Sequence, residues 1–143
     1  MIDGEVVVHE LVLAAPRSAV FAMFVDPAQL VRWIGMSAEL EPRPGGRFRF
    51  EISPGQFCEG SYLEVDPPSR LSFSWGWTEP TMGLPPGSSV VEVELTELAG
   101  QQTHLRLCHR GLPADRLEMH SDGWTHFLAQ LSAVADTVGQ ESR

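Results

Sequence analysis

The chain has 143 residues, of which 43% are hydrophobic, and a formal net charge of -9 at pH 7. A chain of this length can bury enough surface to fold without a disulfide or a metal, so we expect a single domain over residues 1–143. Nucleic acids and anionic membranes both attract basic surfaces, and the acidic balance therefore excludes both as partners.

Cysteine usage and the N-terminal segment predict where the protein works. Cys58 and Cys108 lack a short metal-binding spacing and are expected to be free thiols. The first ten residues, MIDGEVVVHE, lack the basic and apolar regions of a signal peptide. No apolar run approaches the roughly 18 residues of a membrane span. We therefore expect a cytoplasmic protein.

The first third of the chain predicts one strand and two short helices. Residues 5–13, EVVVHELVL, are rich in β-branched residues, as strands are. Pro16 suits the first turn of a helix, and one helical face carries Ala19, Val20, Met23 and Phe24. Asp26 precedes a proline that ends this helix, and its side chain is expected to cap a second short helix that runs through Leu30 to Trp33.

The middle of the chain predicts consecutive strands. Phe73, Trp75 and Trp77 share a parity in LSFSWGW, and Phe48 and Phe50 do so in RFRFEI. Short Pro/Gly-rich turns separate the strands, which favours an antiparallel sheet. The alternating segments are 47–52, 57–65, 71–77, 90–97 and 103–110.

From Pro113 onward the apolar residues recur with helical spacing. A sheet with one apolar face must cover it, and this long helix is the only large cover available. The predicted fold class is therefore α+β. We expect a curved antiparallel sheet of six to seven strands that grips a long C-terminal helix, with two short helices after the first strand.

This order of elements, together with several motifs, resembles the START-like (SRPBCC) helix-grip superfamily. Within it, the chain is most similar to the group related to the C-terminal domain of activators of the heat-shock protein 90 ATPase. The similarity runs through nearly the whole sequence in the right order. The matching stretches are AAPRSAVFAMFVDPAQLVRWIG (14–35), PRPGGRFRF (42–50), GSYLEVDPPSRLSFSWGW (60–77), VVEVELTE (90–97) and GLPADRLEMHSDGWTHFLAQLSAVA (111–135).

The resemblance implies a cavity between the sheet and the long helix, typically for an apolar or aromatic ligand. We expect the protein to bind such a ligand without a metal or an organic cofactor. It implies no shared catalytic residues. Chaperone activators of this group carry a separate N-terminal domain that we do not find in these 143 residues, so a chaperone partner is not expected.

The segment MHSDGWTHFLAQL, residues 119–131, carries two histidines on the predicted helix. His120 and His126 are six residues apart, about 240° around a helix, so they cannot share a metal in the way that an i, i+4 pair does. We therefore expect no metal site. His120 lies on the apolar stripe with Trp124, and Gly123 is expected to let helix and sheet approach closely.

Strand parity supplies possible partners for His120. In 57–65, Phe57, Leu63 and Val65 share one face, and Glu59 and Ser61 lie on that face with them. His109 shares the apolar face of its own strand. If these faces line the cavity, Glu59 and a histidine would form an acid–base pair. An alternative stays open for each residue. A strand twist or bulge would turn Glu59 to solvent, and His120 would be a histidine at the edge of the core that only satisfies a hydrogen bond.

Aromatic residues are abundant enough to line a pocket for a planar ligand. Trp33 is expected to close one mouth of the cavity, and loop 79–88, with Met82 and Leu84, the other. The alternative for each aromatic residue is ordinary core packing. The expected ligand-binding aromatic residues are Trp33, Phe50, Phe73, Trp75, Trp77 and Trp124.

Three functions follow from these features. The first is binding of a small apolar or aromatic molecule. The second is a cyclase, dehydratase or hydrolase acting on a polyketide-like or aromatic substrate, with His120, His109 and Glu59 as candidate catalytic residues. The third is a protein-interaction module acting on a chaperone or regulator. The sequence favours binding over catalysis and leaves a homodimer open.

Overall fold

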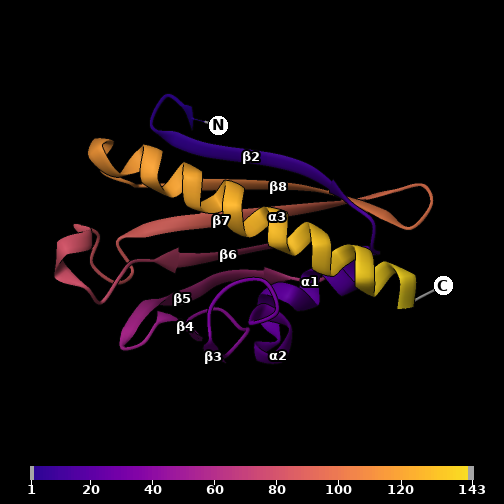
Figure 1. Ribbon diagram of the computed structural model, residues 1–143, viewed down its shortest axis with the longest axis horizontal. Coiled ribbons are helices and arrows are strands. Elements are labelled where there is room, and N and C mark those ends of the chain that lie inside the picture. The colour runs from indigo at the N-terminus through magenta and orange to yellow at the C-terminus, as the bar shows by residue number, and fades with distance from the viewer. Residues whose placement is uncertain (1, 142–143) are drawn as a thin grey trace.

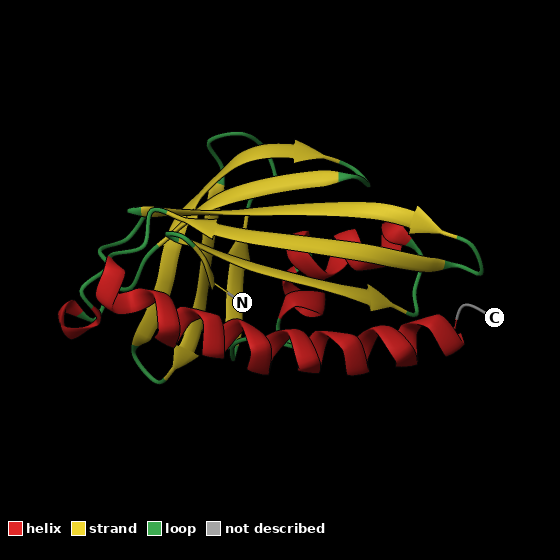
Figure 2. Cartoon of the chain, turned by 90° about the horizontal axis from the view of Figure 1, so that it is seen from above, coloured by secondary structure: helices red, strands yellow, loops and turns green. Residues whose placement is uncertain are grey.

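The computed structural model describes residues 2–141 as one eight-stranded antiparallel sheet, with the long helix α3 (Leu117–Glu141) lying across one face (Figure 1). The strand order is β1-β2-β8-β7-β6-β5-β4-β3, so β2 and β8 pair across a long sequence separation, whereas the other neighbouring strands follow one another in the chain. The sheet curves, and two short helices lie on the same side of it as α3 (Figure 2). The predicted α+β helix-grip architecture is confirmed.

The sheet has more strands than the six to seven expected. Two of the eight are only two and four residues long, too short to show an alternating pattern in the sequence. The strands are β1 Ile2–Asp3, β2 Val6–Leu13, β3 Ser37–Leu40, β4 Arg47–Ser53, β5 Gln56–Asp66, β6 Arg70–Trp75, β7 Ser89–Leu98 and β8 Gln102–Arg110.

The two short helices are α1 (Arg17–Val25) and α2 (Pro27–Leu30). A carboxylate oxygen of Asp26 accepts a hydrogen bond from the backbone N–H of Ala28 at 3.0 Å, which confirms the predicted cap. The second helix is shorter than expected, and Trp33 lies in the turn that follows it.

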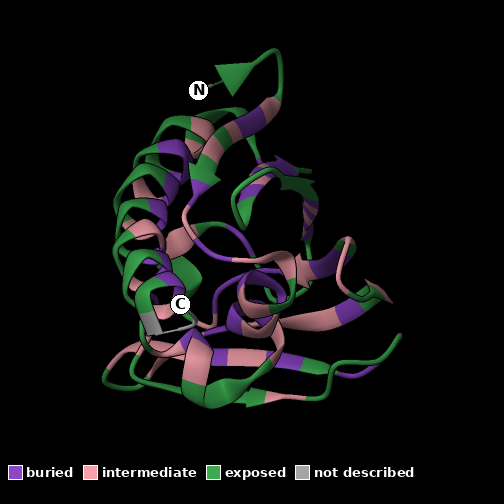
Figure 3. Cartoon of the chain, turned by 90° about the vertical axis from the view of Figure 1, so that its right-hand side faces the viewer, coloured by how far each residue is buried: buried purple, intermediate pink, exposed green. Residues whose placement is uncertain are grey.

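The core lies between the sheet and the three helices, and the predicted alternation of β4 and β6 is confirmed. Phe48, Phe50 and Phe73 are each 1% exposed, and Phe48 and Phe73 stack with ring centroids 4.0 Å apart. Figure 3 shows the buried residues of α3 turned toward this interior. The aromatic rings of β4 and β6 therefore form one cluster in the core, and Trp75 of β6 contacts Trp124 of α3 with ring centroids 5.1 Å apart.

Up to Tyr62 the inward face of β5 is the opposite of the one expected, whereas Val65, which follows a bulge, packs against the core as expected. Cys58 and Tyr62 are fully buried, whereas Leu63 is 49% exposed. Phe57 lies on the outer face, where the guanidinium of Arg49 covers its ring at 3.8 Å from the centroid. A register shift then follows between Tyr62 and Glu64. The prediction failed because a ring covered by an arginine was counted as a core residue.

Helix α3 buries the predicted stripe, which includes Trp124, Leu128 and Leu131. The expected role of Gly123 was wrong, because a Cβ added there would meet no atom within 4 Å. The close approach occurs at Gly139, where an added Cβ would lie 1.8 Å from the carbonyl oxygen of Ala14. No helix among residues 2–141 is long and apolar enough to cross a membrane.

Candidate functional site

A pocket of about 150 Å³ lies between the first half of α3 and the end of β6. It is bounded by apolar and aromatic side chains, with the imidazole of His120 among them. Met119 is 43% exposed beside it. The lining residues are Ile34, Trp75, Trp77, Met82, Met119, His120, Gly123, Trp124 and Phe127.

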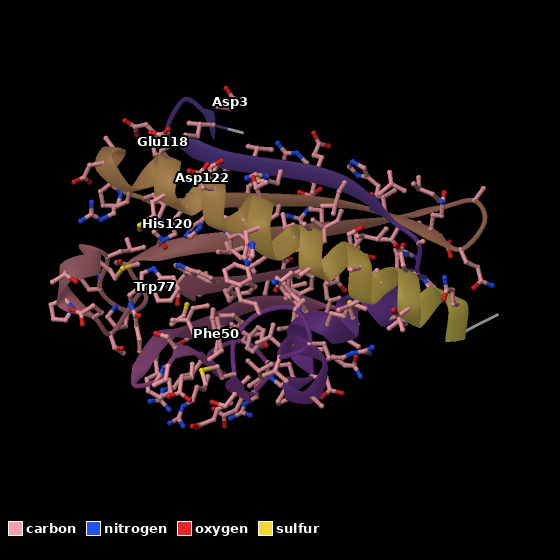
Figure 4. The ribbon with its side chains drawn as sticks, in the orientation of Figure 1. Asp3, Phe50, Trp77, Glu118, His120 and Asp122 are labelled. Atoms are coloured by element: carbon pink, nitrogen blue, oxygen red, sulfur yellow. The ribbon has the colours of Figure 1, made fainter. Side chains whose placement is uncertain are left out.

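His120 is held by two hydrogen bonds. The indole N–H of Trp77 donates to its Nε2 at 3.1 Å. An indole N–H can only donate, so this Nε2 is the acceptor and the ring proton sits on Nδ1. Nδ1 lies 2.9 Å from the carbonyl oxygen of Arg116, one turn earlier, and donates to it. In Figure 4, Trp77 and the side chain of His120 lie next to each other, whereas Glu118 and Asp122 lie on the side of α3 nearer β2.

His109 repeats this arrangement deeper in the protein, where it is fully buried. The indole N–H of Trp124 donates to its Nδ1 at 3.0 Å, which leaves the ring proton on Nε2. Nε2 lies 2.8 Å from Oγ of Ser89, and that hydroxyl donates to the carbonyl oxygen of Trp75 at 2.9 Å. The centroids of the His109 and His120 rings are 5.3 Å apart.

Both imidazoles are therefore kept neutral. Burial, together with the neighbouring His120, lowers the pKa of His109 to about 3. Burial also lowers the pKa of His120, more than its hydrogen bond to the Arg116 carbonyl raises it. With an indole on one nitrogen and an acceptor on the other, each ring has no unused hydrogen-bonding site. The arrangement fixes the orientation of Trp77 and Trp124.

Loop 79–88 covers one side of the pocket. It contains the 3₁₀ helix η1 (Pro80–Met82), whose first turn is capped by a carboxylate oxygen of Glu79 accepting from the backbone N–H of Thr81 at 3.1 Å. Arg116, at the end of the 3₁₀ helix η2 (Ala114–Arg116), donates from Nε to the carbonyl oxygen of Met82. This contact ties the loop to the start of α3.

Four predicted ligand-binding residues meet at the pocket, namely Trp75, Trp77, His120 and Trp124. Met82, expected on the covering loop, also lines it. The sequence interpretation did not name Ile34, Met119 or Phe127 as lining residues. Phe127 belongs to the predicted apolar stripe of α3, and Met119 flanks that stripe, so a wider helical face would have included Met119.

The remaining predicted residues lie elsewhere. His109 is buried behind the pocket, with its ring centroid 5.5 Å from that of Trp75. Phe50 and Phe73 belong to the core. Trp33 closes no mouth, because it is 2% exposed and its indole N–H donates to the carbonyl oxygen of Met23 at 2.9 Å. Ile34, the next residue, reaches the pocket instead.

Glu59 and Ser61 lie on the outer face of the sheet. They line a polar groove there, and Oε2 of Glu59 is 3.8 Å from Nε of Arg49. Of the two alternatives for Glu59, the outward one holds, so the expected carboxylate–histidine pair does not form. His126 is exposed and contacts Gln130. Among the described residues no group of three or more potential metal-ligating side chains occurs.

Comparison with known proteins identifies the family. Residues 14–136 match the family model described as "Activator of Hsp90 ATPase homolog 1-like protein". The chain belongs to this family. The match covers most of the sequence and agrees with the START-like helix-grip resemblance. No curated protein sequence matches the chain.

Solved structures support the same conclusion. An AHSA1-like protein from Rhizobium etli is 43% identical and has a TM-score of 0.71, over 94% of this chain and 86% of that one. DynU16, encoded in the dynemicin biosynthetic locus, is 24% identical with a TM-score of 0.79 over 94% of this chain, which spans only 48% of DynU16. An HSP90 activator from Plasmodium falciparum is 23% identical with a TM-score of 0.73, covering 92% of this chain and 96% of that one. The last two likenesses show the fold alone.

Proposed function

We propose that the protein binds a small apolar or aromatic molecule in the pocket between α3 and the sheet. The observation that carries the proposal is a pocket of about 150 Å³ lined by the rings of Trp75, Trp77 and Trp124. An engineered apolar cavity of about 150 Å³ in another protein binds benzene. The occupant is therefore about the size of one substituted ring.

The geometry favours binding over acid–base catalysis. A general base needs a lone pair that can reach the substrate's proton. Indole N–H groups occupy the lone pairs of both His109 and His120, at 3.0 and 3.1 Å. Glu59, the third candidate, lies on the other face of the sheet with Arg49. These contacts suit side chains that shape a pocket.

The family name raises the alternative of a chaperone partner. Action on a chaperone would use an exposed contact surface, which is a different feature from an internal pocket. We propose a small ligand and not a chaperone partner because the pocket is the feature that supports a function. We also propose a cytoplasmic location, which the two free, buried thiols of Cys58 and Cys108 support.

Isothermal titration calorimetry with benzene and toluene tests the proposal. Wild type is expected to bind one molecule. Gly123→Leu should abolish binding, because a side chain at this position has open space to fill in the pocket. Ala133→Leu adds the same side chain on the exposed face of α3 and should leave binding intact. Absence of binding in wild type, or equal binding by Gly123→Leu, would contradict the proposal.

A further inference from the structure

One buried polar atom of a residue that lines the pocket has no hydrogen-bond partner. Among the described residues, the indole Nε1 of Trp75 is the buried side-chain nitrogen or oxygen that makes no hydrogen bond. Trp75 is 4% exposed and lines the pocket. Buried polar groups in folded proteins are almost always paired, so this donor calls for an explanation.

The other indoles show how unusual this is. Trp77 and Trp124 donate to His120 and His109, and Trp33 donates to the carbonyl oxygen of Met23. The fold thus supplies an acceptor to three of its four tryptophans. The fourth, Trp75, lies against the aromatic rings of Phe50, Trp77 and Trp124 and beside the empty volume.

We propose that the pocket takes an uncharged aromatic molecule bearing an acceptor oxygen, such as a ketone, ester, ether or quinone, and that Trp75 Nε1–H donates to this oxygen. The inference rests on the proposed binding function and specifies its ligand class. A ligand oxygen would satisfy the donor that the protein leaves unpaired, which is a source of selectivity that apolar walls cannot supply.

The rest of the lining argues for an uncharged ligand. A buried anion would need a cation or several donors. No arginine lines the pocket, and the guanidinium of nearby Arg116 already donates to the backbone oxygens of Met82 and Thr81. The ring nitrogens of His120 are both engaged. The single indole N–H of Trp75 is enough to pair with one oxygen atom of an uncharged ligand.

A pair of isosteric probes tests this directly. Acetophenone carries a carbonyl where α-methylstyrene carries a methylene, so the two differ in the acceptor and hardly in shape. The dissociation constants of both are measured for wild type, for Trp75→Phe and for Trp33→Phe. Trp33→Phe is the control, because its indole is already paired outside the pocket. The ratio of the two constants cancels any change in pocket volume.

The preference for acetophenone over α-methylstyrene should fall about three- to tenfold in Trp75→Phe and stay unchanged in Trp33→Phe. In wild type with ¹⁵N-labelled tryptophan, acetophenone should shift the Trp75 indole N–H resonance downfield and α-methylstyrene should not. This second readout does not depend on the stability of a variant.

Two outcomes would overturn the inference, and they are distinguishable. If both probes bind but the preference is equal in wild type and Trp75→Phe, and the Trp75 resonance does not respond to acetophenone, the acceptor is not recognised while pocket binding stands. If neither probe binds wild type, the proposed binding function fails and this inference fails with it.

Discussion

The two halves of α3 meet the sheet side in different ways, although each has a glycine on its inner face. At Gly139, an added Cβ would lie 1.8 Å from the Ala14 carbonyl oxygen, so backbone packs against backbone. At Gly123, an added Cβ would meet no atom within 4 Å. The C-terminal half is closed, and the N-terminal half borders a pocket of about 150 Å³.

The difference shows how one helix can provide both stability and a binding space. In the closed half, fully buried Leu131 and Ala135 pack densely. In the open half, hydrogen bonds from Trp77 and Trp124 to buried histidines fix the rings beside the pocket. Rings held in this way cannot easily turn into the empty volume, and we attribute the persistence of the pocket to these bonds.

The largest effect expected from this comparison is on stability. Leu131→Ala should lower the free energy of unfolding by about 3 kcal/mol, because Leu131 is 0% exposed and its removal leaves a cavity. Phe127→Ala, at the half-buried edge of the pocket, should cost about 1 kcal/mol. Urea unfolding measures both. Equal losses would contradict the division into a closed and an open half.

Low pH should destabilise the protein through the two buried histidines beside the open half of α3. The pKa of His109 is about 3 in the folded protein against an ordinary value of 6.5, so the unfolded state binds more protons between these values. The stabilising contribution is complete above about pH 6.5 and falls by about 1.4 kcal/mol per pH unit as the pH drops toward 3. His120, whose pKa is also lowered, adds to the same trend.

Unfolding free energies between pH 4.5 and 7.5 measure this slope. His109→Asn keeps an acceptor for Trp124 but removes the titrating ring, so its slope should be shallower than that of wild type. His126→Gln is the control, because His126 is exposed. A slope unchanged in His109→Asn would show that the buried ring is not the source.

The smallest expected effect distinguishes the two halves of α3 most clearly. The same Gly→Ala substitution should change the free energy of unfolding with opposite signs in the two halves. Gly123→Ala should raise the free energy of unfolding by roughly 0.5–1 kcal/mol, since alanine is the better helix former and the space is free. Gly139→Ala should lower it by roughly 1 kcal/mol or unfold the last turn of α3, because of the contact with Ala14. Thermal unfolding of both variants gives the answer. Shifts of the same sign would remove the contrast.

The fold could be predicted from the sequence where one periodicity dominates. β4 and β6 alternate large aromatic residues with polar ones, and α3 carries a continuous apolar stripe. β5 could not be predicted, because its buried face holds Cys58 and Tyr62 while Phe57 is covered from outside by Arg49. An alternating pattern shows which side chains are apolar. It does not show whether an apolar side chain is buried in the core or covered at the surface by the guanidinium of an arginine.

The site was only partly predictable for a related reason. Parity places Phe73 and Trp75 on the same face of β6, but it does not say which of them lies beside an empty volume. That depends on the curvature of the sheet and on where α3 departs from it. The histidine–indole pairs could not be predicted from sequence spacing either, since Trp77 and His120 are 43 residues apart in sequence.

The central claim is that the open half of α3 binds a small aromatic molecule, and its most direct test is a two-dimensional NMR titration of the ¹⁵N-labelled protein with acetophenone. We predict saturable shifts in the amides of residues 119–127 and in the indoles of Trp75, Trp77 and Trp124. Amides of residues 131–139 should stay in place. Shifts that are absent, that do not saturate, or that spread equally over both halves of the helix would contradict the claim.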